Sequence, residues 1–233
     1  MISIVLPVIA DSDYLYELTK FTVWCMRNLT KIKHELIIVE TETKRLSEIP
    51  CETYIWLESK SSYSADWNRG AEEATGDYVV HIGNDIIVSD GWLEALLDCY
   101  DYSDCGVASL ACTEPGSVVG AKEPIMVISE GWYGPLMMLP NDCRLDDKAF
   151  PSLGSDSDLI LRQYEKGLRA YRNNAVVCHH LDGATYRRKP ALQRQQETAR
   201  VHQSMVGRWG GSPLWAAKMV LRGYVGQFGK EAE

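Results

Sequence analysis

The stretch ATGDYVVHIGNDIIVSDGWLEALL, residues 74–97, decides the fold of this chain. A small-residue turn leads into the apolar run from Tyr78 to Ile82, which ends at Gly83-Asn84-Asp85 and resumes before a helical pattern. An acid at the carboxyl end of a buried strand, beside a glycine that admits a ligand, is typical of α/β proteins that bind phosphates. Hard cations prefer carboxylate oxygens and keep several waters, so one or two protein ligands suffice. The stretch therefore predicts a divalent cation held at Asp85.

Strand and helix patterns alternate on both sides of this stretch. Strands are expected over residues 2–9, 34–40, 51–58, 77–82, 106–111, 125–129 and 136–139, and a further one ends at 180. Helices are expected over residues 14–29, 64–75, 91–100, 155–167, 190–206 and 214–224. This order predicts an α/β fold with a Rossmann-like, doubly wound sheet, helices on both faces and a C-terminal helical extension.

Composition narrows the class of protein. The chain has 233 residues and 45% hydrophobic content, enough for a full core. No apolar run reaches the roughly 18 residues that a membrane span needs. Seven cysteines, an odd number without a C-x-x-C pair, favour reduced thiols and a cytoplasmic location.

The charge of the chain is unevenly distributed. Residues 187–233 carry nine Lys or Arg and three Glu, a net charge of about +6. Since the whole chain has a net charge of −8, residues 1–186 carry about −14. Such a basic segment could face an anionic membrane, a nucleic acid or the phosphates of a donor. The alternative is a solvated helical face.

Acidic and polar side chains lie at the ends of two further elements. Glu40 and Glu42 end the strand over 34–40, where a carboxylate can accept hydrogen bonds from a base or a ribose, although surface charge there is also common. Asn68 and Arg69 lie in the helix over 64–75 and could reach a base or phosphates. The alternative is a packed helix face.

Two aspartates, Asp156 and Asp158, begin the helix over 155–167. Helix dipole and capping preferences alone would place acids there, and Ser155-x-x-Asp158 has the pattern of a capping box. The functional interpretation is a general base that takes a proton from an attacking hydroxyl. Asp156 is better placed for this role, because Asp158 at the capping position is expected to bind backbone amides.

The strand that ends in Cys178-His179-His180 can supply an imidazole to the same cation. Adjacent residues point to opposite faces of a strand, so only one of the two histidines is expected to reach it. The other is expected to be packed or hydrogen-bonded, and Cys178 to lie in the core.

In this order the segments resemble the family 2 glycosyltransferases of the GT-A fold, over residues 1–186. The matching pieces are ISIVLPV, HELIIVE, NRGAxxATGDYVV, IGNDIIVxxGWL, GxDxDLxxRxxxxG and HxxGxT. The resemblance implies inverting sugar transfer from a nucleotide-diphospho-sugar by direct displacement, with an aspartate base and Mn²⁺ or Mg²⁺ on the diphosphate. It also implies a nucleotide-sugar half over 1–110, an acceptor and catalytic half over 111–186, and a basic helical extension over 187–233.

The resemblance assigns roles to individual positions. Asp156 matches the base, Asp85 the last residue of the metal motif, and His180, with His179 as the alternative, the histidine near the metal. Glu40 falls where the family binds the nucleoside, and Trp132 and Tyr133, before Gly134, fall roughly where it lines the acceptor site. Together with the residues described above, we expect donor binding at Pro7, Glu40, Glu42, Asn68, Arg69, Asn84 and Asp85, and acceptor binding at Trp132, Tyr133, Gly134 and Asp158.

Two positions depart from the family pattern. Gly83 replaces the first acid of the metal motif, and Ser155 replaces the acid that precedes the base. Both changes keep open a second interpretation, a non-catalytic module that binds sugars or nucleotides. A third, a sugar nucleotidyltransferase, is disfavoured because residues 10–13 form an acidic loop without glycine.

The acceptor is left open by the residues. It could be a glycan, a lipid-linked sugar, a protein or a nucleic acid. The basic C-terminal segment could also make a peripheral membrane contact or pair with a second copy of the chain.

Overall fold

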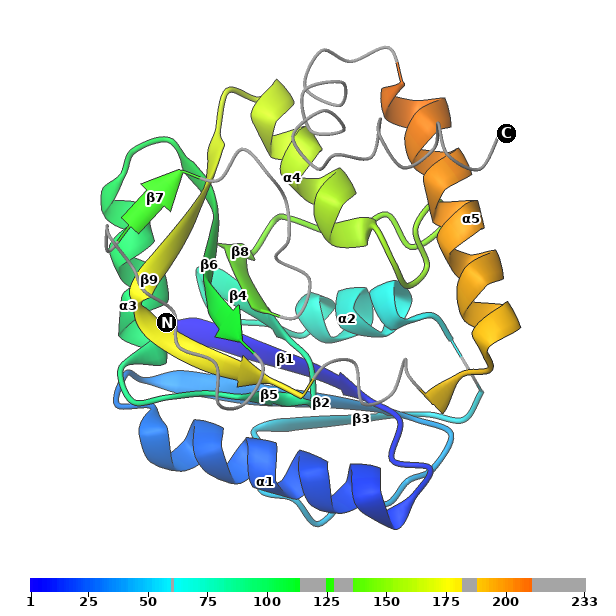
Figure 1. The fold of residues 1–233 in the computed structure, drawn as a ribbon. Coiled ribbons are helices and arrows are strands. Elements are labelled where there is room, and N and C mark those ends of the chain that lie inside the picture. Colours follow the sequence, from blue (N-terminus) through cyan, green and yellow to red (C-terminus); the bar gives the residue numbers. More distant parts are fainter. Residues whose placement is uncertain (60, 114–124, 128–135, 182–187, 211–233) are drawn as a thin grey trace.

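The computed structural model describes residues 1–59, 61–113, 125–127, 136–181 and 188–210 (Figure 1). In chain order the described elements are β1 (Ile2–Val8), α1 (Asp13–Leu29), β2 (His34–Thr41), β3 (Thr53–Leu57), α2 (Tyr63–Glu72), β4 (Tyr78–Ile82), β5 (Ile86–Ile87), α3 (Trp92–Asp98), a 3-10 turn (Cys99–Asp101), β6 (Cys105–Thr113), β7 (Ile125–Val127), β8 (Leu136–Pro140), α4 (Ser155–Glu165), β9 (Arg169–His180) and α5 (Ala191–Trp209).

All the described strands join one mixed sheet, in the order β3-β2-β1-β4-β8-β6-β9-β5, with β7 also paired to β9. The strands β3, β2, β1 and β4 run parallel to one another. β8 is antiparallel to both β4 and β6, whereas β6 and β9 are parallel. The predicted α/β sheet is confirmed, and its parallel half brings the carboxyl ends of β1, β2 and β4 to one edge.

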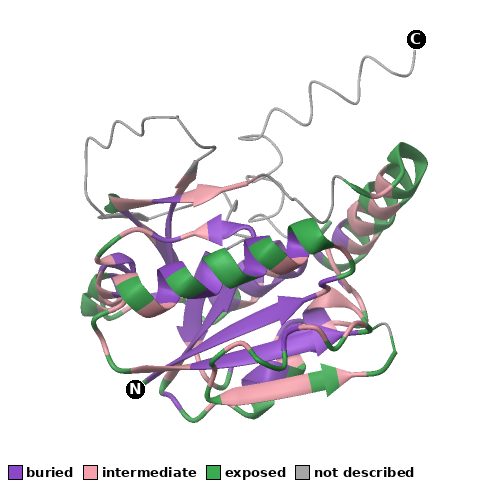
Figure 2. Ribbon diagram, turned by 90° about the horizontal axis from the view of Figure 1, so that it is seen from below, coloured by how far each residue is buried: buried purple, intermediate pink, exposed green. Residues whose placement is uncertain are grey.

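Helices cover both faces of the sheet, as predicted (Figure 1). Alternate residues of β1 show the two sides: Ile4 and Leu6 pack with α1 and α3, and Val5 packs with α2 and α4. An ideal Cβ on Gly70 of α2 would lie 2.4 Å from Val5 Cγ1, so the glycine lets α2 approach the sheet closely. The strands are consequently buried on both faces, as Figure 2 shows for the centre of the sheet.

Serine caps set where the first two helices begin. Ser12 Oγ accepts a hydrogen bond from the backbone N–H of Leu15 at 3.3 Å, and Ser62 Oγ accepts one from Ala65 at 3.1 Å. The cap at Ser62 starts α2 at Tyr63, one residue earlier than expected. The helix also ends at Glu72 rather than at 75.

The helix α5 packs on α4 at the outside of the fold (Figure 1). Their contact is a small apolar cluster of Phe150, Leu161, Met205 and Trp209. The helix expected over 190–206 is confirmed and extends to Trp209, whereas the helix expected over 214–224 lies outside the described residues. Among the residues that the structure describes, no helix is long and apolar enough to cross a membrane.

Candidate functional site

Asp85 and His180 meet at the turn between β4 and β5. The carboxylate Oδ2 of Asp85 lies 3.5 Å from His180 Nε2. Antiparallel pairing places Ile86 opposite His180, and the N–H of Leu181 donates to the carbonyl of Asp85 at 2.9 Å. The register of β5 on β9 therefore brings together the two side chains predicted to hold the cation.

Gly83 makes room for the Asp85 carboxylate. An ideal Cβ at Gly83 would lie 2.8 Å from Asp85 Oδ1, closer than an ordinary van der Waals contact. The Asp85 side chain thus occupies space that a larger residue at 83 would take.

The donor set fits a hard cation that keeps other ligands. Within the described residues, no three His, Cys, Asp or Glu side chains gather closely enough to hold a metal ion by themselves. Asp85 and His180 offer two ligands, and water or phosphate oxygens would complete the shell. His179 lies opposite Ile87 on the other face of β9, and its Nδ1 is buried without a hydrogen-bond partner among the described residues.

Asp156 lies in the first turn of α4. The helix starts after Gly154, which has φ 81° and serves as the N-cap without any side-chain hydrogen bond. The expected capping box is therefore wrong, because Ser155 is already helical and Asp158 binds other groups. Asp156 is partly exposed, and no described residue forms a hydrogen bond with its carboxylate.

Tyr63 links the two acids of the site. It is the first residue of α2, and its ring meets the ring of His81 edge-on at a centroid distance of 5.3 Å. Burial raises the pKa of the Tyr63 hydroxyl, and the charges of Asp85 and Asp156 raise it further. Both carboxylates therefore act electrostatically on the Tyr63 phenol.

Sequence reasoning missed Tyr63 and His81. Tyr63 falls one residue before the helix expected from apolar spacing, and His81 sits within an apolar run. His81 is buried against Tyr63 and Trp67, and burial lowers its pKa to about 3. The serine cap at 62 was the signal available for the position of Tyr63.

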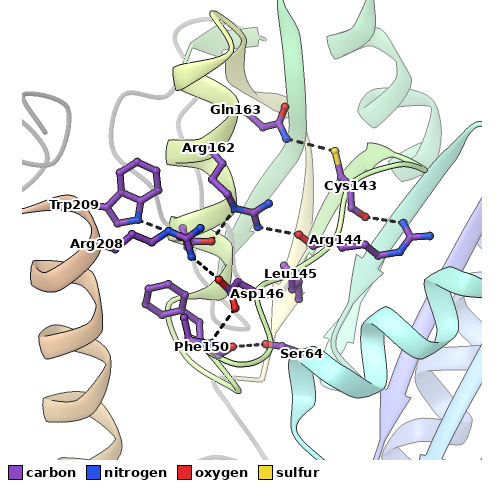
Figure 3. A network of polar contacts seen from close by, with 12 residues as sticks. Ser64, Cys143, Arg144, Leu145, Asp146, Phe150, Arg162, Gln163, Arg208 and Trp209 are labelled. Carbon is purple, nitrogen blue, oxygen red and sulfur yellow. Dashed lines mark hydrogen bonds and ion pairs between the residues drawn. The ribbon is translucent and has the colours of Figure 1, made fainter.

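The loop before α4 is fastened to α2 (Figure 3). Ser64 Oγ donates to the carbonyl of Phe150 at 2.7 Å. The side-chain amide of Asn68 makes two hydrogen bonds with the backbone of Leu145, each at 2.9 Å. Its Nδ2 donates to the carbonyl, and its Oδ1 accepts from the N–H. Asn68 thus holds the loop that leads to Asp156, and its predicted donor contact stays a prediction.

Glu40 organises the loop that follows β2. Its buried carboxylate accepts from the backbone N–H groups of Arg45 and Leu46 and from the hydroxyl of Tyr54, each at 2.7 Å, and also from the Thr43 hydroxyl. Glu42 is exposed in the same loop, with a left-handed φ of 71°. Of the two predicted donor-binding acids, Glu42 is therefore the one on the surface.

The other predicted donor residues have partners outside the Asp85–His180 pair. Asn84 donates to Thr19 Oγ1 at 3.1 Å and so ties the turn to α1. Arg69 is exposed on α2 and pairs with Glu72 and Glu73. Pro7 is buried in β1, in register with Val39 of β2.

The predicted acceptor residues are placed differently. Trp132, Tyr133 and Gly134 lie outside the described residues. Asp158 is 0% exposed, and its carboxylate accepts from Trp209 Nε1 at 3.0 Å and from Arg162 Nε at 2.9 Å. This burial leaves no surface of Asp158 for an acceptor.

Solved structures with this fold include glycosyltransferases. TarS of S. aureus has a TM-score of 0.58 at 13% identity, over 88% of this chain and 43% of that chain. GalNAc-T7 with UDP, GalNAc and Mn²⁺ has a TM-score of 0.64 at 12% identity, over 77% and 43%. The mannosyltransferase PcManGT from Pyrobaculum calidifontis, in complex with GDP-Man and Mn²⁺, has a TM-score of 0.59 at 12% identity, over 94% and 74%. The chain thus spans less than half the length of the first two.

A search of curated protein sequences finds no match. The family model described as glycosyl transferase family 2 matches residues 3–193, most of the chain and all of the elements that build the site. The chain therefore belongs to glycosyl transferase family 2.

Proposed function

We propose that this glycosyltransferase moves a sugar from a nucleotide-diphospho-sugar to an acceptor hydroxyl with inversion, and that it depends on Mn²⁺ or Mg²⁺. The observation that carries the proposal is the approach of Asp85 Oδ2 to His180 Nε2 at 3.5 Å, in a chain that belongs to glycosyl transferase family 2. The structures of GalNAc-T7 and PcManGT were both solved with Mn²⁺, which supports a divalent cation here.

Asp85 and His180 would hold the cation. When bound, it would neutralise the charge of the departing diphosphate. Asp85 is 7% exposed, so its carboxylate is largely shielded from solvent. Charges act more strongly in such a shielded position than in open solvent.

Asp156 would act as the general base. It would take the proton of the acceptor hydroxyl as the new bond forms between the acceptor oxygen and the anomeric carbon, while the bond from that carbon to the diphosphate breaks. A single displacement from the opposite face inverts the anomeric centre. Tyr63 would orient the reacting groups, because the charges of Asp85 and Asp156 both act on its hydroxyl, which has no hydrogen bond to a described residue.

The donor base would lie beside the loop after β2. Glu40 would act there by fixing the loop and Glu42 by direct contact. Asn68 and Asn84 would also support the site, through their hydrogen bonds to Leu145 and Thr19. Trp132 and Tyr133 remain our candidates for stacking on the acceptor.

The replacement Asp156→Asn tests the assignment. We expect sugar transfer and metal-dependent donor hydrolysis to fall by at least about a hundredfold, because the amide cannot accept the proton. Binding of the nucleotide diphosphate with Mn²⁺, measured by thermal shift, should be unchanged. Asp101→Asn, the same substitution at an exposed position, serves as the control.

Two outcomes would contradict the proposal. Full activity of Asp156→Asn would remove the base from that position. Wild-type protein that binds a nucleotide diphosphate but never releases one from a donor would instead be a non-catalytic binding module. A survey of donors with each nucleotide base, with and without Mn²⁺, also identifies the base that the loop after β2 accepts.

A further inference from the structure

The last turn of α5 contacts the first turn of α4 through Asp158. Figure 3 shows Arg208 and Trp209 of α5 reaching toward α4. Trp209 Nε1 donates to Asp158 Oδ1 at 3.0 Å, and Arg208 Nε lies 3.2 Å from the same oxygen. The other oxygen, Oδ2, accepts from Arg162 Nε at 2.9 Å within α4. One buried carboxylate therefore joins the two helices.

The energetics of this carboxylate make the contact strong. Asp158 is fully buried, and a buried charge is costly unless it is paired and hydrogen-bonded. α5 supplies two of its three partners, Arg208 and Trp209. Withdrawal of α5 would leave a poorly compensated charge in the first turn of α4, so that turn would have to rearrange.

A second contact lies at the other side of Asp156. An ideal Cβ on Gly154, the N-cap of α4, would lie 2.7 Å from Val201 Cγ1 of α5. The glycine thus permits the two helices to touch where α4 begins. α5 contacts positions 154 and 158, which bracket Asp156 in the chain.

The C-terminal end of α5 also binds the loop before α4. Arg208 pairs with Asp146, whose pKa is lowered by the N–H of Ala149 and by this guanidinium. Asp146 follows Leu145, which Asn68 binds from α2. The loop, α4 and α5 therefore form one connected polar network.

We propose that Trp209, Arg208 and Val201 are positioning residues that set the direction of the Asp156 carboxylate through Asp158 and Gly154. The inference rests on the proposed role of Asp156 as the base. These residues lie beyond residue 193, where the family match ends. The segment that follows the family region would then be part of the catalytic apparatus.

The replacement Trp209→Phe tests the inference, since it keeps an aromatic ring and removes the indole N–H. We expect kcat for Mn²⁺-dependent donor hydrolysis to fall by about tenfold to a hundredfold, because small misplacements of a catalytic group have effects of this size. KM for the donor should stay within about twofold, because the donor side of the site is untouched. Trp24→Phe, at an exposed position on α1, is the matched control.

Hydrogen exchange of the backbone amides of residues 155–158 gives a readout that does not depend on activity. Exchange there should speed up in Trp209→Phe and not in Trp24→Phe. Should Trp209→Phe fail to fold, Val201→Ala replaces it in both measurements, with the same expected directions.

Three results overturn the inference. They are unchanged exchange at 155–158, unchanged kcat, or a loss of kcat that is matched by equal losses in donor affinity and thermal stability. Failure of the proposed function looks different: the wild-type protein would then show no donor hydrolysis, while exchange would still report whether α5 braces α4.

Discussion

Replacing His81 by phenylalanine should remove a loss of stability that the wild-type protein suffers in mild acid. His81 is 2% exposed in β4, and neither ring nitrogen has a hydrogen-bond partner among the described residues. The rings of Tyr63 and Trp67 meet the His81 ring edge-on, with centroid-to-centroid distances of 5.3 and 5.4 Å. This burial favours the neutral imidazole and lowers the pKa of His81 from 6.5 to about 3.

The sign and size of the effect follow from proton linkage. Below pH 6.5 the unfolded chain binds a proton at His81, whereas the folded protein binds it only near pH 3. Stability therefore falls as the pH drops through this window. Between pH 7.5 and 5.0 the His81 contribution amounts to about 2 kcal/mol of unfolding free energy. For a chain of this size that corresponds to roughly 4–8 °C in Tm.

Urea denaturation of the wild type and His81→Phe at pH 7.5 and 5.0 measures this difference. Other groups titrate in both proteins, so the quantity of interest is the extra loss in the wild type. His202→Phe, a histidine replaced on α5, should keep the wild-type loss because His81 is intact. Equal losses in the wild type and His81→Phe would refute the buried, neutral and unpartnered state of this imidazole.

Three further substitutions probe the site and its support. Gly83→Ala should weaken Mn²⁺ binding, measured by calorimetry, by about tenfold. The new Cβ would lie 2.8 Å from Asp85 Oδ1, so the carboxylate must move to reach the 3.4 Å of an ordinary contact. Unchanged affinity would contradict the metal role of Asp85. Tyr63→Phe should lower kcat by about tenfold without lowering Tm, and an unaltered kcat would exclude the hydroxyl from the reaction. Gly154→Ala should lower Tm more than Gly167→Ala, because both glycines have φ 81° but only the first faces a neighbouring helix. Equal losses of Tm in the two variants would mean that backbone strain alone, about 1–3 kcal/mol, accounts for the effect.

The parallel half of the sheet could be predicted from the sequence, and the antiparallel half could not. Strands buried on both faces give continuous apolar runs, and those in β1, β2 and β4 are bounded by clear turn and helix signals. The insertion of β8 between β4 and β6 depends on pairing between distant segments. No local pattern encodes such a neighbour.

Some residues of the candidate site could likewise be predicted from the sequence, and the contacts of others could not. Asp85 and His180 could be predicted because Asp85 comes shortly after β4 and His180 is the last residue of β9, and strand ends of one sheet can meet at an edge. The partners of Asn84 and Asp158 could not, because they belong to α1 and α5. Polar side chains look alike in a sequence whether they face a ligand or another helix.

The ion pairs of Arg188, Lys189 and Arg208 also reduce the free positive charge of residues 187–233. Arg188 pairs with Asp11 at 2.8 Å, Lys189 with Glu197 at 2.9 Å, and Arg208 with Asp146 and Asp158. A cation that is paired with a carboxylate of the protein has fewer mobile counterions to exchange with a phosphate-rich partner. Binding of such a partner would therefore depend on ionic strength less steeply than nine unpaired cations would require. Arg188 and Arg208 thus join the basic segment to the acidic body of the enzyme.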